Sequence, residues 1–99
     1  MRWYELEPTV YMAISMIEMS DLSIQINCAK LILKEIDNVS EDYILKNIIA
    51  LSEAQIHPKN RWYDKNELVS KAFDYLKHVS KDNQKAISQN VLDYLKVAA

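Results

Sequence analysis

The 99-residue chain contains no glycine, only two prolines and a single cysteine. Average usage near 7% would supply about seven glycines. Glycine is the usual residue where the backbone needs a positive φ or must lie close to a ligand. Phosphate-binding loops, dinucleotide fingerprints, nucleophile elbows and type I′ hairpins depend on it. The sequence therefore argues against enzymes and nucleotide-binding proteins built on these motifs.

Other scarcities bear on location. The lone Cys28 cannot form an intramolecular disulfide, which favours a reducing compartment. No apolar run approaches the ~20 residues of a membrane span. Glutamates and Pro8 stand where a secretion signal needs an apolar stretch. We expect a cytoplasmic protein without a membrane segment. The excess of lysine over arginine, with many Ile and Asn, suits an AT-rich coding genome and points to a bacterium.

The composition is that of one globular domain, residues 1–99, with 49% apolar and 26% charged residues. The net charge is −2, and lysines alternate with acids along most of the chain. Nucleic-acid binding usually needs a clustered basic face, so the charge pattern argues against that partner.

Apolar residues at helical spacing predict five helices, which begin near Pro8, at Ser20 or Asp21, at Ser40, near Asp64, and at Ser80 or Asp82. Asp64–Glu67 has the form of a capping box for the fourth helix, and Asn38 is expected in the left-handed conformation that ends the second. We expect an all-α, compact antiparallel bundle of four to five helices. Three predicted core faces are Val10, Ala13, Ile14 and Ile17; Leu22, Ile26, Ala29, Leu33 and Ile36; and Ala86, Ile87, Val91, Tyr94 and Leu95.

An Arg-Trp-Tyr-acid tetrapeptide occurs twice, beginning at Arg2 and at Arg61. At the same offset of 59 residues (2 to 61), Val10 matches Val69 and Ala13 matches Ala72. The pattern is compatible with two similar helical hairpins flanking a middle helix, and also with chance resemblance between helical stripes. In either case each tryptophan precedes a helix, where it can pack back as a hydrophobic staple.

Two stretches are candidate interaction sites. Met12, Met16 and Met19 form a second apolar stripe on the first helix, which suggests self-association as a homodimer, with a core role as the alternative. The segment 57–66 combines bases with aromatics. Its candidate partner-binding residues are Lys59, Arg61, Trp62 and Tyr63. The alternative is that these aromatics cover the end of the bundle.

Chemical sites have weaker signals. Glu53 with His57, and Asp74 with His78, are spaced four apart, which is compatible with a shared metal ion, but exposed histidines beside incidental acids have the same pattern. Cys28 lies among apolar residues and is expected to be a small buried hydrophobe. We therefore expect no cofactor and no catalytic residue. The favoured function is a non-enzymatic, self-associating protein-interaction module of adaptor, immunity or regulatory type. The alternatives are a nucleic-acid-binding regulator that uses residues 57–66 and the following helix, and a metal-binding helical protein.

Overall fold

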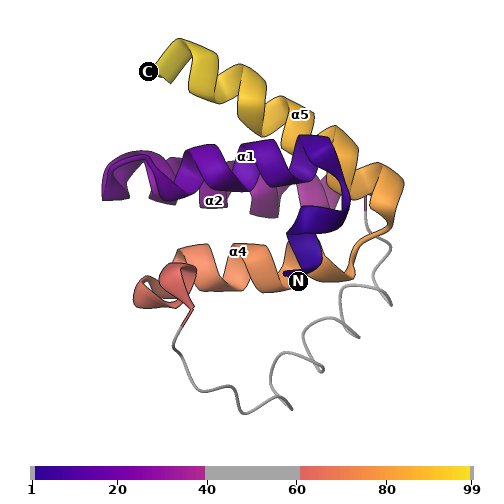
Figure 1. Cartoon of the computed structure of the whole chain (residues 1–99), viewed down its shortest axis with the longest axis horizontal. Coiled ribbons are helices and arrows are strands. Elements are labelled where there is room, and N and C mark those ends of the chain that lie inside the picture. Colours follow the sequence, from indigo (N-terminus) through magenta and orange to yellow (C-terminus); the bar gives the residue numbers. More distant parts are fainter. Residues whose placement is uncertain (1, 40–60, 99) are drawn as a thin grey trace.

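The computed structural model describes residues 2–39 and 61–98 (Figure 1). Helix of the α or 3-10 type accounts for 88% of these residues, and none of them is in a strand. The expected all-α bundle is confirmed, while the helix expected from Ser40 lies outside the described residues. The elements are η1 (Trp3–Leu6), α1 (Pro8–Glu18), α2 (Leu22–Val39), η2 (Trp62–Lys65), α4 (Glu67–His78) and α5 (Lys81–Ala98).

The two halves repeat the same structure. We call residues 2–39 repeat 1 and residues 61–98 repeat 2. Each element of repeat 2 begins 59 residues after its counterpart in repeat 1; for example, α2 begins at residue 22 and α5 at residue 81. Local hydrogen bonds shift by the same offset. Asp21 caps α2 by accepting from the Ile24 amide, and Ser80 accepts from the Asn83 amide at the start of α5. The two hairpins are therefore structural equivalents.

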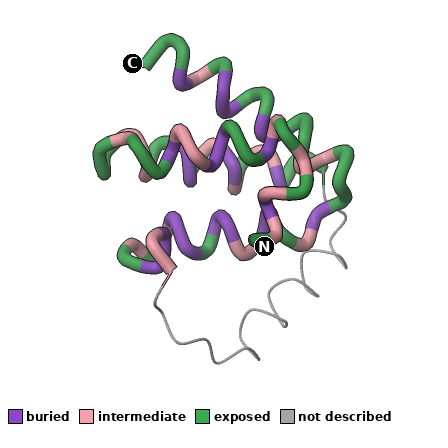
Figure 2. Tube along the Cα trace, in the orientation of Figure 1, coloured by how far each residue is buried: buried purple, intermediate pink, exposed green. Residues whose placement is uncertain are grey.

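The hairpins pack crosswise. The first helix of each repeat lies mainly against the second helix of the other, so that α1 packs on α5 and α4 packs on α2, with α2 and α5 also in contact. Figure 1 shows α5 running along α1, and Figure 2 shows the buried positions turned towards the interior. The exchange of partners indicates that the repeats are related by an approximate twofold axis. The largest fully buried side chains include Phe73, Ile14, Ile17, Ile32 and Ile36.

The first helix of each repeat ends without a left-handed residue, since no described residue has a positive φ. Instead, the Gln25 amide, in the first turn of α2, donates to the carbonyls of Ile17 (3.1 Å) and Ser20 (3.2 Å). In repeat 2 the equivalent Gln84 donates to the carbonyls of Lys77 (3.1 Å) and Val79 (3.3 Å). A side-chain amide thus satisfies carbonyls that a glycine C-cap would otherwise satisfy.

Several local expectations were wrong. Asn38 is helical, because α2 continues to Val39. The N-cap of α4 is Asn66 rather than Asp64, and the Asn66 side chain accepts from the Leu68 and Val69 amides. Asp64 belongs to η2, where its carboxylate accepts from the Arg61 amide.

The predicted apolar faces also need correction. The buried face of α2 is rotated from the predicted stripe because the helix packs on both α4 and α5. That face consists of Cys28, Ala29, Ile32 and Ile36, whereas Leu22 is exposed. On α5, Ala86 is exposed rather than buried.

We predict that Gln25→Ala and Gln84→Ala each lower the free energy of unfolding by about 1 kcal/mol, because each removes two hydrogen bonds that join the second helix of the repeat to the end of the first helix and the turn after it. Urea denaturation monitored by circular dichroism measures the loss. Gln89 bonds only to the exposed Asp93 one turn along the same helix, so Gln89→Ala is the control and should change stability by less than about 0.5 kcal/mol. Equal stability of all three variants would contradict a role in closing the helix ends.

Candidate functional site

The two Arg-Trp-Tyr segments adopt one conformation. Each begins with an extended arginine, with φ and ψ of −76° and 149° at Arg2 and −77° and 153° at Arg61. A 3-10 turn follows, and the acid three residues on accepts from the arginine amide. Within each segment the Trp and Tyr rings meet edge to face, with centroids 5.5 Å apart in η1 and 5.4 Å apart in η2. The shared tetrapeptide therefore specifies a shared local structure.

The arginine of repeat 2 is held by two acids. Its guanidinium bonds to both carboxylate oxygens of Asp64, at 2.7 and 2.8 Å, and lies 3.1 Å from Asp74. Ser70 donates to Asp64 at 2.7 Å. These bonds, chiefly those from Arg61, lower the pKa of Asp64 to about 2 against the cost of burial. The same carboxylate contact raises the pKa of Arg61, which stays positively charged. Its charge is balanced by acids of its own repeat.

The arginine of repeat 1 is much less engaged. Arg2 donates to the Tyr4 hydroxyl at 3.1 Å, and its contact with Glu5 is long, at 3.9 Å. Its side chain is 62% exposed, compared with 29% for Arg61. The same residue type therefore supplies a structural ion pair in one repeat and an accessible cation in the other.

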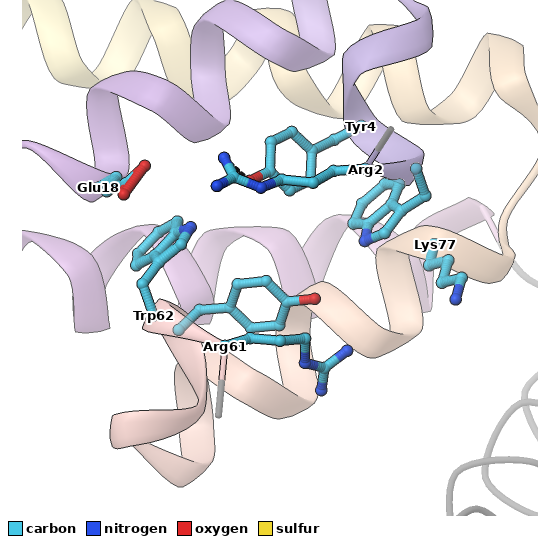
Figure 3. A pocket seen from close by; sticks show the side chains of 8 residues that line it. Arg2, Tyr4, Glu18, Arg61, Trp62 and Lys77 are labelled. Atoms are coloured by element: carbon cyan, nitrogen blue, oxygen red, sulfur yellow. Dashed lines mark hydrogen bonds between the residues drawn. The ribbon is translucent and has the colours of Figure 1, made fainter. Parts of the chain in front are cut away.

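The two Arg-Trp-Tyr segments and the C-terminal ends of α1 and α4 line a pocket of about 390 Å³ (Figure 3). Its lining consists of four pairs of repeat-equivalent residues, namely Arg2 and Arg61, Trp3 and Trp62, Tyr4 and Tyr63, and Glu18 and Lys77. Because every lining residue has its counterpart across the exchange of repeats, the pocket lies on the approximate twofold axis. We call it the axial pocket. In Figure 3 Glu18 and Lys77 stand at opposite ends of it.

Both indole nitrogens at the pocket are buried and have no hydrogen-bond partner. The Trp3 N–H comes near enough to the Tyr63 hydroxyl to oppose the rise that burial causes in the pKa of Tyr63, yet the two do not reach hydrogen-bond geometry. In Figure 3 the Trp62 nitrogen is turned towards Arg2 and Glu18. An unpaired buried donor costs about 1–3 kcal/mol, so two at equivalent positions require an explanation.

The predicted partner-binding residues take part in packing. Trp62 is half-buried against the core, and its ring meets Phe73 at a centroid distance of 5.5 Å. Tyr63 is buried, 4.8 Å from the same ring. This packing supports the alternative in which the aromatics cover the bundle, while Trp62 still reaches the axial pocket. Lys59 lies outside the described residues.

The methionine stripe divides into two parts. Met12 is 55% exposed and Met19 is 80% exposed, whereas Met16 is half-buried and packs against the core. A core role therefore applies to Met16 alone. The other two remain on the surface of α1.

The metal and thiol candidates have other surroundings. Glu53 and His57 lie outside the described residues, and Asp74 is ion-paired with Arg61. No group of three metal-ligating side chains occurs within residues 2–39 and 61–98. Cys28 is fully buried, as expected, and burial raises the pKa of its thiol to about 11.

Sequence reasoning missed most of the axial pocket. It singled out Arg61, Trp62 and Tyr63 but not their counterparts Arg2, Trp3 and Tyr4, nor Glu18 and Lys77. The repeat offset was the available signal, since it pairs all of them. Comparison with family models, with curated proteins and with solved structures finds no match to this chain.

We predict that Trp3→Ala and Trp62→Ala each lower the free energy of unfolding by about 3 kcal/mol, because both remove a large ring packed against the core. Thermal denaturation measures the loss. Val97→Ala, at an apolar side chain near the end of α5 that is 87% exposed, is the control and should stay within about 0.5 kcal/mol of the parent. A Trp62 variant as stable as the parent would show that this ring is not a structural cover.

We also predict a pH-dependent contribution from Asp64. Its pKa is lowered on folding, so its stabilisation is present above the unfolded value near 4 and is lost as pH falls towards 2. At pH 7, Asp64→Asn should cost roughly 2 kcal/mol, at about 1.4 kcal/mol per pKa unit. The deficit should shrink below pH 4, as measured by urea denaturation at each pH. Glu5→Gln removes the equivalent but longer contact and should cost less than about 0.5 kcal/mol. A deficit that does not change with pH would contradict the ion-pair account.

Proposed function

We propose that the chain is a non-enzymatic protein-interaction module that self-associates through the outward face of α1. The residues 8, 12, 15 and 19 recur at helical spacing opposite the buried face and form the α1 outward stripe, which consists of Pro8, Met12, Ser15 and Met19. Tyr11 lies beside the stripe and is 46% exposed. Of the seven large apolar side chains exposed among the described residues, five fall between positions 6 and 22.

The proposal rests on a comparison of the two repeats. The positions of α4 that match the stripe hold Glu67, Lys71, Asp74 and His78. Beyond the helix, Leu6 and Leu22 match Lys65 and Lys81. The same backbone therefore folds with charged residues at these positions, so folding does not require the apolar ones. An apolar surface that folding does not require is typical of an interaction site.

A second copy of the chain is the partner that we favour. An exposed methionine surface packs adaptably, and twofold dimers are the commonest closed assembly. The charges on α4 have both signs, which supports a protein partner over nucleic acid. The buried Cys28 thiol, with its raised pKa, supports a role without nucleophilic catalysis.

We propose a cytoplasmic location, because a single cysteine, which cannot form a disulfide within this chain, is typical of a reducing compartment. None of the helices in the described ranges combines the length and hydropathy that a membrane crossing requires.

The test transfers repeat 2 residues onto repeat 1. The double variant Met12→Lys and Met19→His should remain folded, because α4 carries those residues at the same positions. Burial of one such side chain is worth about 1.5–3 kcal/mol, so the dimer dissociation constant should rise more than tenfold. Sedimentation equilibrium measures it.

Lys71→Gln with His78→Gln alters the matching positions of α4 and is the control, which should leave association unchanged. A parent chain that stays monomeric at about 1 mM, a weak association of ~4 kcal/mol, would refute self-association. A double variant that dimerises as strongly as the parent would refute the assignment to α1.

A further inference from the structure

The axial pocket is the part of the molecule in which the repeats agree most closely in sequence. Aligned at the 59-residue offset, residues 2–39 and 61–98 share seven identities, namely Arg2 and Arg61, Trp3 and Trp62, Tyr4 and Tyr63, Val10 and Val69, Ala13 and Ala72, Gln25 and Gln84, and Leu33 and Leu92. Three of these seven pairs line the axial pocket.

The core is less strict than the pocket. Its equivalent positions interchange apolar residues freely, as Ile14 with Phe73 and Ile32 with Val91. A core needs residues that are apolar and of suitable volume rather than particular side chains. Arg61 alone of the two arginines forms a short ion pair with a buried carboxylate. Each arginine lies over the tyrosine two residues on, with the guanidinium carbon 5.9 Å from the Tyr4 ring centre and 4.5 Å from the Tyr63 ring centre, and both line the pocket.

Hydrogen-bond donors are in excess around the pocket. Arg2 is exposed and weakly paired, and Lys77 has no ion pair with the described residues. Both indole N–H groups are unpartnered. Glu18 is the single carboxylate among the lining residues. An oxyanion would correct this imbalance, since carboxylates and phosphates accept several charge-assisted hydrogen bonds.

The size and walls of the pocket indicate what carries the oxyanion. A volume of about 390 Å³ lies in the range of small-molecule sites and far exceeds the ~30 Å³ share of a water molecule. Four aromatic rings line it, and they favour a flat apolar body. Lys77 stands at the end opposite Glu18, so the favourable place for negative charge is the Lys77 end (Figure 3).

We propose that the axial pocket binds a small aromatic acid, a planar ring bearing one carboxylate or phosphate, with its oxyanion at the Lys77 end. The ring lies against the tryptophan and tyrosine side chains. Glu18 repels the oxyanion from the other end of the pocket, where the Arg2 guanidinium also lies (Figure 3). The proposal does not depend on self-association, because the α1 outward stripe contributes no residue to the pocket.

Intrinsic fluorescence tests the proposal directly, because both tryptophans of the chain line the pocket. The probes are benzoate and phenyl phosphate, titrated at constant ionic strength. Benzamide supplies the ring without the charge, and inorganic phosphate the charge without the ring. We expect a saturable fluorescence change with an aryl anion, and binding at least about tenfold weaker for the two controls. Whichever aryl anion binds more tightly identifies the oxyanion.

The pair Glu18 and Lys77 supplies matched variants, since both are exposed and occupy equivalent positions. Lys77→Gln should weaken aryl-anion binding about threefold or more, and Glu18→Gln should strengthen it by a similar factor. Lys85→Gln removes an exposed lysine outside the pocket and should change binding by less than about twofold.

Three results would overturn the proposal. One is the absence of a saturable change with either aryl anion at concentrations up to about 10 mM, where binding is already very weak. Another is benzamide binding as tightly as benzoate, which would mean that the charge is not recognised. The third is either Gln variant behaving as Lys85→Gln does or shifting affinity in the opposite direction. Retention of aryl-anion binding by the Met12→Lys and Met19→His variant would show that pocket and dimer surface are independent.

Discussion

Closing the helix ends without a left-handed residue is the constraint on which the rest of the described structure depends. The chain has no glycine, and at the end of the first helix of each repeat the side-chain amide of Gln25 or Gln84 adds to the backbone hydrogen bonds that the last carbonyls accept. Because that glutamine belongs to the second helix, one interaction both satisfies the carbonyls and ties the hairpin together. The fixed hairpins then cross, and the crossing brings the two Arg-Trp-Tyr segments to the same pocket.

Much of the fold could be predicted from helical periodicity and from the repeated tetrapeptide. The buried face of α1 was predicted residue by residue, because Val10, Ala13 and Ile14 repeat at a spacing that only a helix satisfies. The face of α2 was misplaced, because this helix has two apolar stripes and long-range packing on two partners selects between them. The offset of 59 residues pairs Trp3 with Trp62 and so indicates which residues are equivalent, but it does not place them together in space, so the axial pocket itself could not be predicted.

The two repeats also show that one backbone fold accepts different surface residues. Their cores are nearly interchangeable, and their exteriors are opposite in character, with Met12 and Met19 facing solvent where α4 has Lys71 and His78. At the pocket, the equivalent residues Glu18 and Lys77 have opposite charges. Because the two repeats differ at their surfaces, the proposed dimer surface belongs to repeat 1 alone, whereas the axial pocket is lined equally by both repeats.

The burial of Cys28 has a consequence for how the chain behaves over time. Its sulfur lies on the face of α2 that packs against both α4 and α5, and it is the single thiol of the sequence. A thiol reacts as the thiolate, and a pKa near 11 leaves very little thiolate at neutral pH. Alkylation of the native chain therefore has to wait for α2 to separate from its neighbours. The rate at which Cys28 is alkylated therefore measures how often α2 separates from the core.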